Sequence, residues 1–129
     1  MIALVATAAG TFAVDLETDE VAPAQPFDPA PAPVLSLPRV VAAAEAGSTV
    51  VAVVDTRPPM VVSHDAGVTW RESGRGLPPG RAVAVAVDDP DTVLYAARNR
   101  LYVSRNGGVF WTALAVELPE IEAVALREC

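Results

Sequence analysis

Two segments of the chain follow one eight-residue pattern and start 41 residues apart, at Ser63 and Ser104. They read Ser-His-Asp-Ala-Gly-Val-Thr-Trp and Ser-Arg-Asn-Gly-Gly-Val-Phe-Trp. A short acceptor at the third position can fold back onto backbone N–H groups, and glycine at the fifth position can adopt a positive φ. Each segment is therefore predicted to form a tight turn, with its tryptophan opening the return strand. The residues expected to build these two boxes are Ser63, Asp65, Gly67 and Trp70, and Ser104, Asn106, Gly108 and Trp111.

A second marker reports the same period. The dipeptide Leu-Pro occurs at residues 37–38, 77–78 and 118–119, which are 40 and then 41 residues apart. Each Leu-Pro is followed by an apolar run, at residues 40–44, 81–87 and 122–126. Small and branched residues alternate in these runs, which is typical of strands that are covered on both faces. A helix over residues 40–46, suggested by Ala-Ala-Ala-Glu-Ala, is the main local alternative.

The boxes resemble the Asp-box of BNR-type β-propellers, whose blades repeat every ~40–45 residues. The resemblance implies an all-β fold of about three four-stranded antiparallel blades. Residues 2–6 and 12–16 are expected to be the second and third strands of a blade, and residues 122–126 its missing first strand. The expected organisation is a degenerate blade at 1–38 with a Pro-rich segment at 21–38, blades at 39–79 and 80–119, and the completing inner strand at 120–129.

Three blades are fewer than the 4–8 with which propellers usually close. Two open faces lined with Val and Ala are then expected to meet water. One hypothesis is a homodimer that forms a six-bladed ring, in which residues 122–126 of one copy complete the N-terminal blade of the other. The alternative is a fragment of a longer propeller. The Pro-rich segment is expected to form an edge strand or an extended connection across the outside of the blade.

Charge and composition limit the partners. Nine basic and sixteen acidic residues give a net charge of −7, which disfavours nucleic acid. No apolar run is long enough to span a membrane. The apolar residues 1–10 have no basic residue before them, so a cytoplasmic location is expected, with secretion as the alternative. Cys129 is the single cysteine, which excludes an internal disulfide.

No catalytic, cofactor or metal site is expected. Asp65 is interpreted as a turn acceptor, and both tryptophans as core wedges. His64 lies between Ser63 and Asp65, but neighbouring side chains diverge, so this string is no catalytic triad. Asp88, Asp89 and Asp91 are interpreted as a solvated turn and not as a calcium loop. The sialidase resemblance implies an arginine triad and a Tyr/Glu pair, yet none of the candidates lies in a recognisable motif: Arg39, Arg81, Arg98, Arg100, Arg105, Tyr95 and Tyr102.

The function expected from these observations is that of a non-catalytic repeat module for protein interaction or scaffolding. The resemblance extends to sortilin-like receptors and photosystem assembly factors, which implies protein or peptide binding. An oligomeric, lectin-like propeller that binds carbohydrate is the first alternative. A fragment of a sialidase-type or glycoside-hydrolase-type propeller is the second, and an enzyme of this kind would be a glycosidase.

Overall fold

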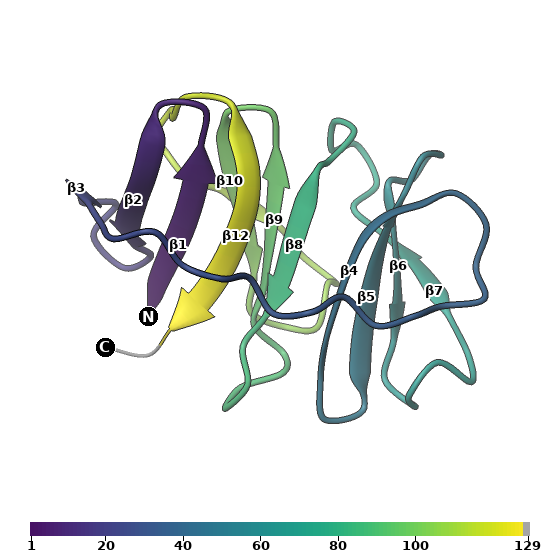
Figure 1. Cartoon of the computed structure of the whole chain (residues 1–129). Helices are drawn as coiled ribbons and strands as arrows, with labels where there is room; N and C mark the ends of the chain where they lie inside the picture. The colour runs from purple at the N-terminus through teal and green to yellow at the C-terminus, as the bar shows by residue number, and fades with distance from the viewer. Residues whose placement is uncertain (128–129) are drawn as a thin grey trace.

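The chain folds into three four-stranded antiparallel sheets, as Figure 1 shows for the computed structural model, which describes residues 1–127. Blade 1 contains β4–β7, blade 2 contains β8–β11, and blade 3 has the strand order β12-β1-β2-β3. No helix occurs in the described residues, so the expected all-β fold is confirmed and the helical alternative for residues 40–46 is wrong. These sheets are blades of a partial propeller.

The strands follow the predicted runs closely. In blade 1 they are β4 (Val40–Ala46), β5 (Thr49–Val54), β6 (Met60–Ser63) and β7 (Arg71–Ser73). In blade 2 they are β8 (Ala82–Val85), β9 (Val93–Ala97), β10 (Arg100–Ser104) and β11 (Thr112–Ala113). In blade 3 they are β12 (Ile121–Arg127), β1 (Ile2–Thr7), β2 (Gly10–Asp15) and β3 (Val21–Pro23).

Blade 3 is built from both ends of the same chain. Strand β12 pairs antiparallel with β1, with Val124 opposite Val5 and Ile121 opposite Thr7. The prediction that residues 122–126 supply the missing first strand is correct in place, but the blade completed is the chain's own and not that of a second copy. The two ends lie side by side (Figure 1), so pairing within the chain proceeds at a high effective concentration and needs no partner.

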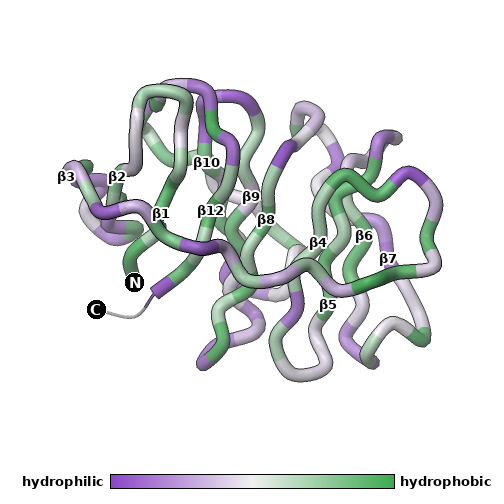
Figure 2. The backbone as a smooth tube through the Cα atoms, viewed as in Figure 1, coloured by the Kyte–Doolittle hydropathy of each residue, from purple (hydrophilic) through white to green (hydrophobic). Residues whose placement is uncertain are grey.

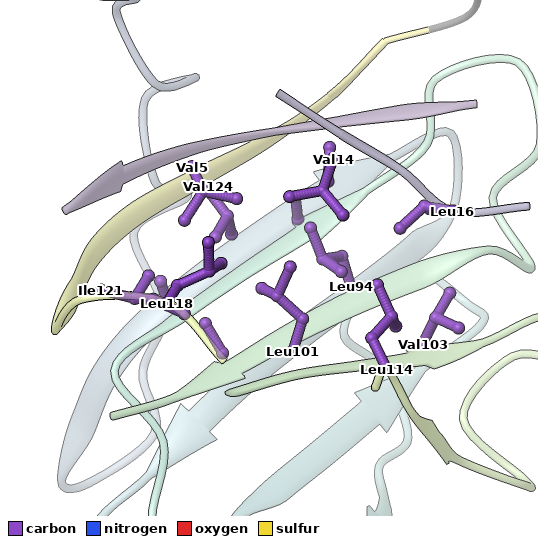
Figure 3. Packing of buried hydrophobic residues seen from close by; sticks show 14 residues of the cluster. Val5, Val14, Leu16, Leu94, Leu101, Val103, Leu114, Leu118, Ile121 and Val124 are labelled. Atoms are coloured by element: carbon purple, nitrogen blue, oxygen red, sulfur yellow. The ribbon is translucent and has the colours of Figure 1, made fainter. Parts of the chain in front are cut away.

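Blade 2 lies between the other two blades, and two buried apolar clusters fill the spaces on its two sides. The first cluster joins blade 2 to blade 3, and Figure 3 shows Leu94 and Leu101 of blade 2 near Val14 and Val124 of blade 3. The second cluster joins blade 2 to blade 1 and includes Tyr95. Because β9 contributes to both clusters, it is apolar on both faces and fully buried.

The Pro-rich connection from β3 to β4, residues 24–39, crosses the inner strands of all three blades; we call it the strap (Figures 1 and 2). Its segment Pro29–Ala32 and the inner strands β4, β8 and β12 together line a cavity of about 330 Å³. The expectation that this connection runs across the outside of a blade is therefore wrong, although β3 is the expected edge strand.

Parts of the faces that blades 1 and 3 turn away from blade 2 are buried. In β5, Val51 and Val53 belong to the second cluster, so Val50 and Ala52 point to the opposite face. Val50 is nevertheless only 4% exposed and Ala52 0%. On blade 3, Leu4 alternates with two residues of the first cluster and is 8% exposed. The homodimer stays a prediction.

Candidate functional site: the grooves beside the repeated boxes

The first box, Ser63 to Trp70, is held by a network centred on two side chains. The hydroxyl of Ser63 accepts hydrogen bonds from Gly67 N at 2.8 Å and Asp65 N at 3.3 Å, and donates to Asp65 Oδ1 at 2.7 Å. Asp65 Oδ1 also accepts from Thr69 N at 2.8 Å, and Thr69 Oγ1 donates to Asp65 Oδ2. Three side chains and three backbone N–H groups thus close one turn between β6 and β7.

These bonds set the ionisation of Asp65. Hydrogen bonds from the side chain and backbone of Thr69, followed by that from Ser63, lower the pKa of Asp65 from 3.8 to about 2. A carboxyl that acts as a general acid near neutral pH needs a raised pKa. The environment of Asp65 shifts it in the opposite direction, which is the behaviour of a turn acceptor.

The second box, Ser104 to Trp111, repeats the turn with a neutral acceptor. Ser104 Oγ accepts from Gly108 N at 2.9 Å and donates to Asn106 Oδ1 at 3.0 Å. Phe110 N donates to the same Oδ1 at 3.0 Å. Phe110 occupies the position of Thr69, so the second box lacks the hydroxyl donor of the first and instead carries a phenyl ring that is 74% exposed.

Both boxes end later than predicted. Each tryptophan is predicted to open its return strand, but β7 is Arg71–Ser73 and β11 is Thr112–Ala113. The hydrogen bonds from residues 69 and 110 to the acceptor side chains keep the backbone in the turn up to those positions. The tryptophans therefore precede the return strands and do not belong to them.

Residues 15–22 of the degenerate blade stand where a third box would be expected. They lack the eight-residue pattern of the boxes but still form a turn. Asp15 Oδ1 accepts from Glu17 N at 2.9 Å and Thr18 N at 3.3 Å, as the serine hydroxyls do in the boxes. Hydrogen bonding to the Glu17 backbone lowers the pKa of Asp15. Asp19 takes a positive φ of 59°, in place of the box glycine. This turn closes the outer side of blade 3.

The two tryptophans have different surroundings, which the sequence did not predict. Trp111 packs on the second cluster, meets Tyr95 edge-on at 6.0 Å between ring centroids, and donates from Nε1 to Ser73 Oγ of blade 1 at 3.1 Å. Trp70 is half-buried and belongs to neither cluster. Trp111 is thus a wedge between blades, whereas the expectation of a core wedge is wrong for Trp70.

Two grooves flank the second box, and their linings correspond through the repeat. The first groove, of about 430 Å³, lies between the second box and β7 of blade 1, and includes His64 and Arg71. The second groove, of about 470 Å³, lies between β11 and the turn at residues 15–22, and includes Arg105 and Thr112. His64 and Arg105 are 41 residues apart, and so are Arg71 and Thr112. Phe110 lines both grooves and so stands on the ridge that separates them.

The charges in the two grooves are balanced differently. In the second groove, Arg105 pairs with Glu17 at 3.3 Å. In the first groove, Arg75 approaches Glu72 only at 4.0 Å, at a highly exposed position. Arg71 has no carboxylate within ion-pair distance in the described part of the chain. The first groove therefore offers one guanidinium group, that of Arg71, without a carboxylate partner in the described residues, beside an exposed aromatic ring.

Three other residues considered as candidate site residues, His64, Tyr95 and Asp89, take part in hydrogen bonds within the fold. Ser63 Oγ bonds to Asp65, while His64 Nδ1 lies 3.3 Å from Thr49 Oγ1, so the three do not converge. Tyr95 is fully buried and donates from its hydroxyl to Pro78 O at 2.6 Å, and burial raises its pKa. Asp89 accepts from Thr92 Oγ1 at 2.8 Å in a turn.

The described residues hold neither a cluster of possible metal ligands nor a helix that could cross a membrane. No three His, Cys, Asp or Glu side chains within residues 1–127 are grouped so that they could hold a metal ion. The same residues include no helix long and apolar enough to cross a membrane. Cys129 lies outside the described residues.

No model of a known protein family matches the chain, and no curated protein matches it either. Among solved structures, the chain is similar to the GH74 enzyme of Niastella koreensis, with 24% sequence identity and a TM-score of 0.51. The match covers 89% of this chain and 17% of that enzyme, so the chain spans a small part of its length. At this identity the likeness shows the fold alone, which is that of β-propeller blades.

Proposed function

We propose that the chain is a non-catalytic β-propeller module of the Asp-box type that binds a protein or peptide across the ridge formed by the second box. The observation that carries the proposal is Phe110. At the equivalent position the first box has Thr69, whose hydroxyl and backbone both bond to the acceptor. The second box has a phenyl ring that is 74% exposed.

A large apolar side chain that replaces a stabilising polar one on a surface is a departure that function, and not folding, explains. Val109 beside it is 61% exposed, so the ridge presents two apolar side chains in succession. Exposed aromatic residues are the side chains that most often anchor protein interfaces. The first groove gives a partner a concave surface next to this anchor.

The non-catalytic part of the proposal is supported by the carboxyl groups. Glycoside hydrolysis requires a pair of carboxyls, one of which has a raised pKa. The carboxyls whose pKa the structure shifts, Asp15 and Asp65, are both shifted downward by hydrogen bonds in turns. Both serve the backbone of a box or its relic, which is a structural task.

The test is the replacement Phe110→Thr, which gives the second box the residue of the first. We expect the variant to fold at least as stably as the wild type, because the threonine hydroxyl can accept a hydrogen bond from Asn106 Nδ2, where Thr69 Oγ1 donates to Asp65 Oδ2. A random peptide library panned on the wild type should yield binders whose affinity falls about tenfold or more in the variant. Val68→Thr is the matched control, because Val68 is 80% exposed at the equivalent of Val109 and lines neither groove.

Three results would overturn the proposal. The first is a library that yields no binder, and the second is a set of binders that Phe110→Thr leaves unaffected. The third is a glycan array in which the folded wild type binds a saccharide and that binding depends on Phe110, which would establish the lectin-like alternative. Hydrolysis of a fluorogenic glucoside or sialoside would contradict the non-catalytic role.

A further inference from the structure

The first groove has a charge opposite to that of the protein as a whole. The chain carries sixteen acidic and nine basic groups, with a net charge of −7. The first groove is lined by Arg71, Arg75 and the exposed His64, and by one carboxylate, that of Glu72. The Glu72 side chain is 63% exposed, and its carboxylate comes no nearer to Arg75 than 4.0 Å. An exposed pair at this distance is worth little, so the guanidinium groups remain available to another carboxylate.

The second groove provides a comparison within the same molecule. There the position of Arg71 is Thr112 and that of Glu72 is Ala113. Its single arginine, Arg105, is paired with Glu17 at 3.3 Å. The two grooves share the ridge and the backbone plan and differ in their charge, so the first groove is the one that can select an anionic ligand.

The floor of the first groove is held in place by bonds between blades. Ser73 Oγ of β7 donates to Gly108 O at 2.6 Å and accepts from Trp111 Nε1 at 3.1 Å. A Cβ added to Gly108 would lie 2.9 Å from Ser73 Oγ, so the second box and β7 are in close contact. A site built on such a fixed floor has less conformational freedom to lose when a ligand binds.

We propose that the first groove binds an acidic segment of a protein partner, with carboxylates on Arg71 and Arg75 and an adjacent apolar side chain on Phe110. The proposal rests on the proposed function and names the chemistry of its partner. Guanidinium groups bind carboxylates through parallel hydrogen bonds, and Arg71 has no internal carboxylate to compete for it. Phe110 lines the same groove as both arginines, so one short segment can reach all three.

The test uses two labelled peptides: Asp-Glu-Asp-Leu-Phe-Glu-Asp, and a copy with Asn and Gln in place of Asp and Glu. The wild type should bind the acidic peptide at least about tenfold more tightly than the neutral copy. Arg71→Glu should weaken the acidic peptide about tenfold or more. Added salt should weaken the acidic peptide more than the neutral one, because exposed charges are screened.

Arg105→Glu is the matched control, because it changes the net charge by the same amount in the neighbouring groove. It should change the affinity for the acidic peptide less than about twofold. Equal affinity for the two peptides, equal losses in Arg71→Glu and Arg105→Glu, or binding of neither peptide would each overturn the inference. If both peptides bind equally and Phe110→Thr weakens both, the proposed function stands and the acidic partner alone is wrong.

Discussion

The two boxes have the same turn and differ in what they contribute to the molecule. The first box is tied by a charged acceptor, Asp65, that receives hydrogen bonds from a serine and from both groups of Thr69. The second box has a neutral acceptor, Asn106, with fewer donors. Its tryptophan, however, is bonded to the preceding blade, while Trp70 of the first box contacts neither core cluster.

The position of each blade explains this difference. Trp111, which belongs to blade 2, donates a hydrogen bond to Ser73 of β7 in the neighbouring blade 1. Blade 1 lies at one end of the row of three blades, so within the described residues Trp70 has no neighbouring blade in the place that blade 1 takes beside Trp111. The first box therefore depends on its own hydrogen bonds, whereas the second is supported by its neighbour and can carry Phe110 in place of a donor.

The largest predicted effect separates the two tryptophans. Trp111→Ala should lower the free energy of unfolding by about 3 kcal/mol, because it removes an indole packed between blades and leaves Ser73 without a donor. Trp70→Ala should cost about 1 kcal/mol, as expected for a residue outside the core. Urea unfolding followed by far-UV circular dichroism measures both, and equal losses would contradict the distinction.

The second prediction compares the acceptors. Asp65→Ala should lower the urea midpoint more than Asn106→Ala, because it deprives more donors of their acceptor. Asp65→Asn should recover part of the loss, since an amide oxygen can still accept from Thr69 N. A larger loss in Asn106→Ala would show that support from blade 1 does not spare the second box.

The third prediction concerns pH. The pKa of Asp65 is about 2 in the folded chain and 3.8 when unperturbed, so its ionised form stabilises the fold. This contribution is complete above the unperturbed value and is lost as the pH falls through about 2. The urea midpoint should therefore drop between about pH 5 and pH 2, and the drop should be smaller in Asp65→Asn. Asp15, whose pKa is also lowered, should leave a residual slope. An unchanged slope in Asp65→Asn would show that the network does not depend on charge.

The smallest effect concerns the fourth position of the boxes. Ala66 has a positive φ of 59°, and its equivalent Gly107 has 70°. Because an L side chain is disfavoured there, Ala66→Gly should stabilise the chain by up to about 1 kcal/mol. Gly107→Ala should destabilise it, since the new Cβ would lie 2.9 Å from His64 Cε1. Thermal unfolding of both variants checks the signs.

The sequence by itself determined the blades. The period of about 41 residues, the paired boxes and the apolar runs locate most of the strands, because turn chemistry and strand alternation are local properties that the residues carry with them. The same local reasoning identified Asp65 and Asn106 as the acceptors of the two turns. It could not distinguish Trp70 from Trp111, because the two are identical within their repeats.

Only the tertiary structure decided how these units are used. It placed β12 beside β1 of the same chain, carried the strap across the inner strands, and gave Trp111 a partner that Trp70 lacks. It also brought Arg71 and Phe110, which belong to different blades, into one groove. Such contacts join residues far apart in the sequence, and they depend on which blade lies next to which, which no local pattern records.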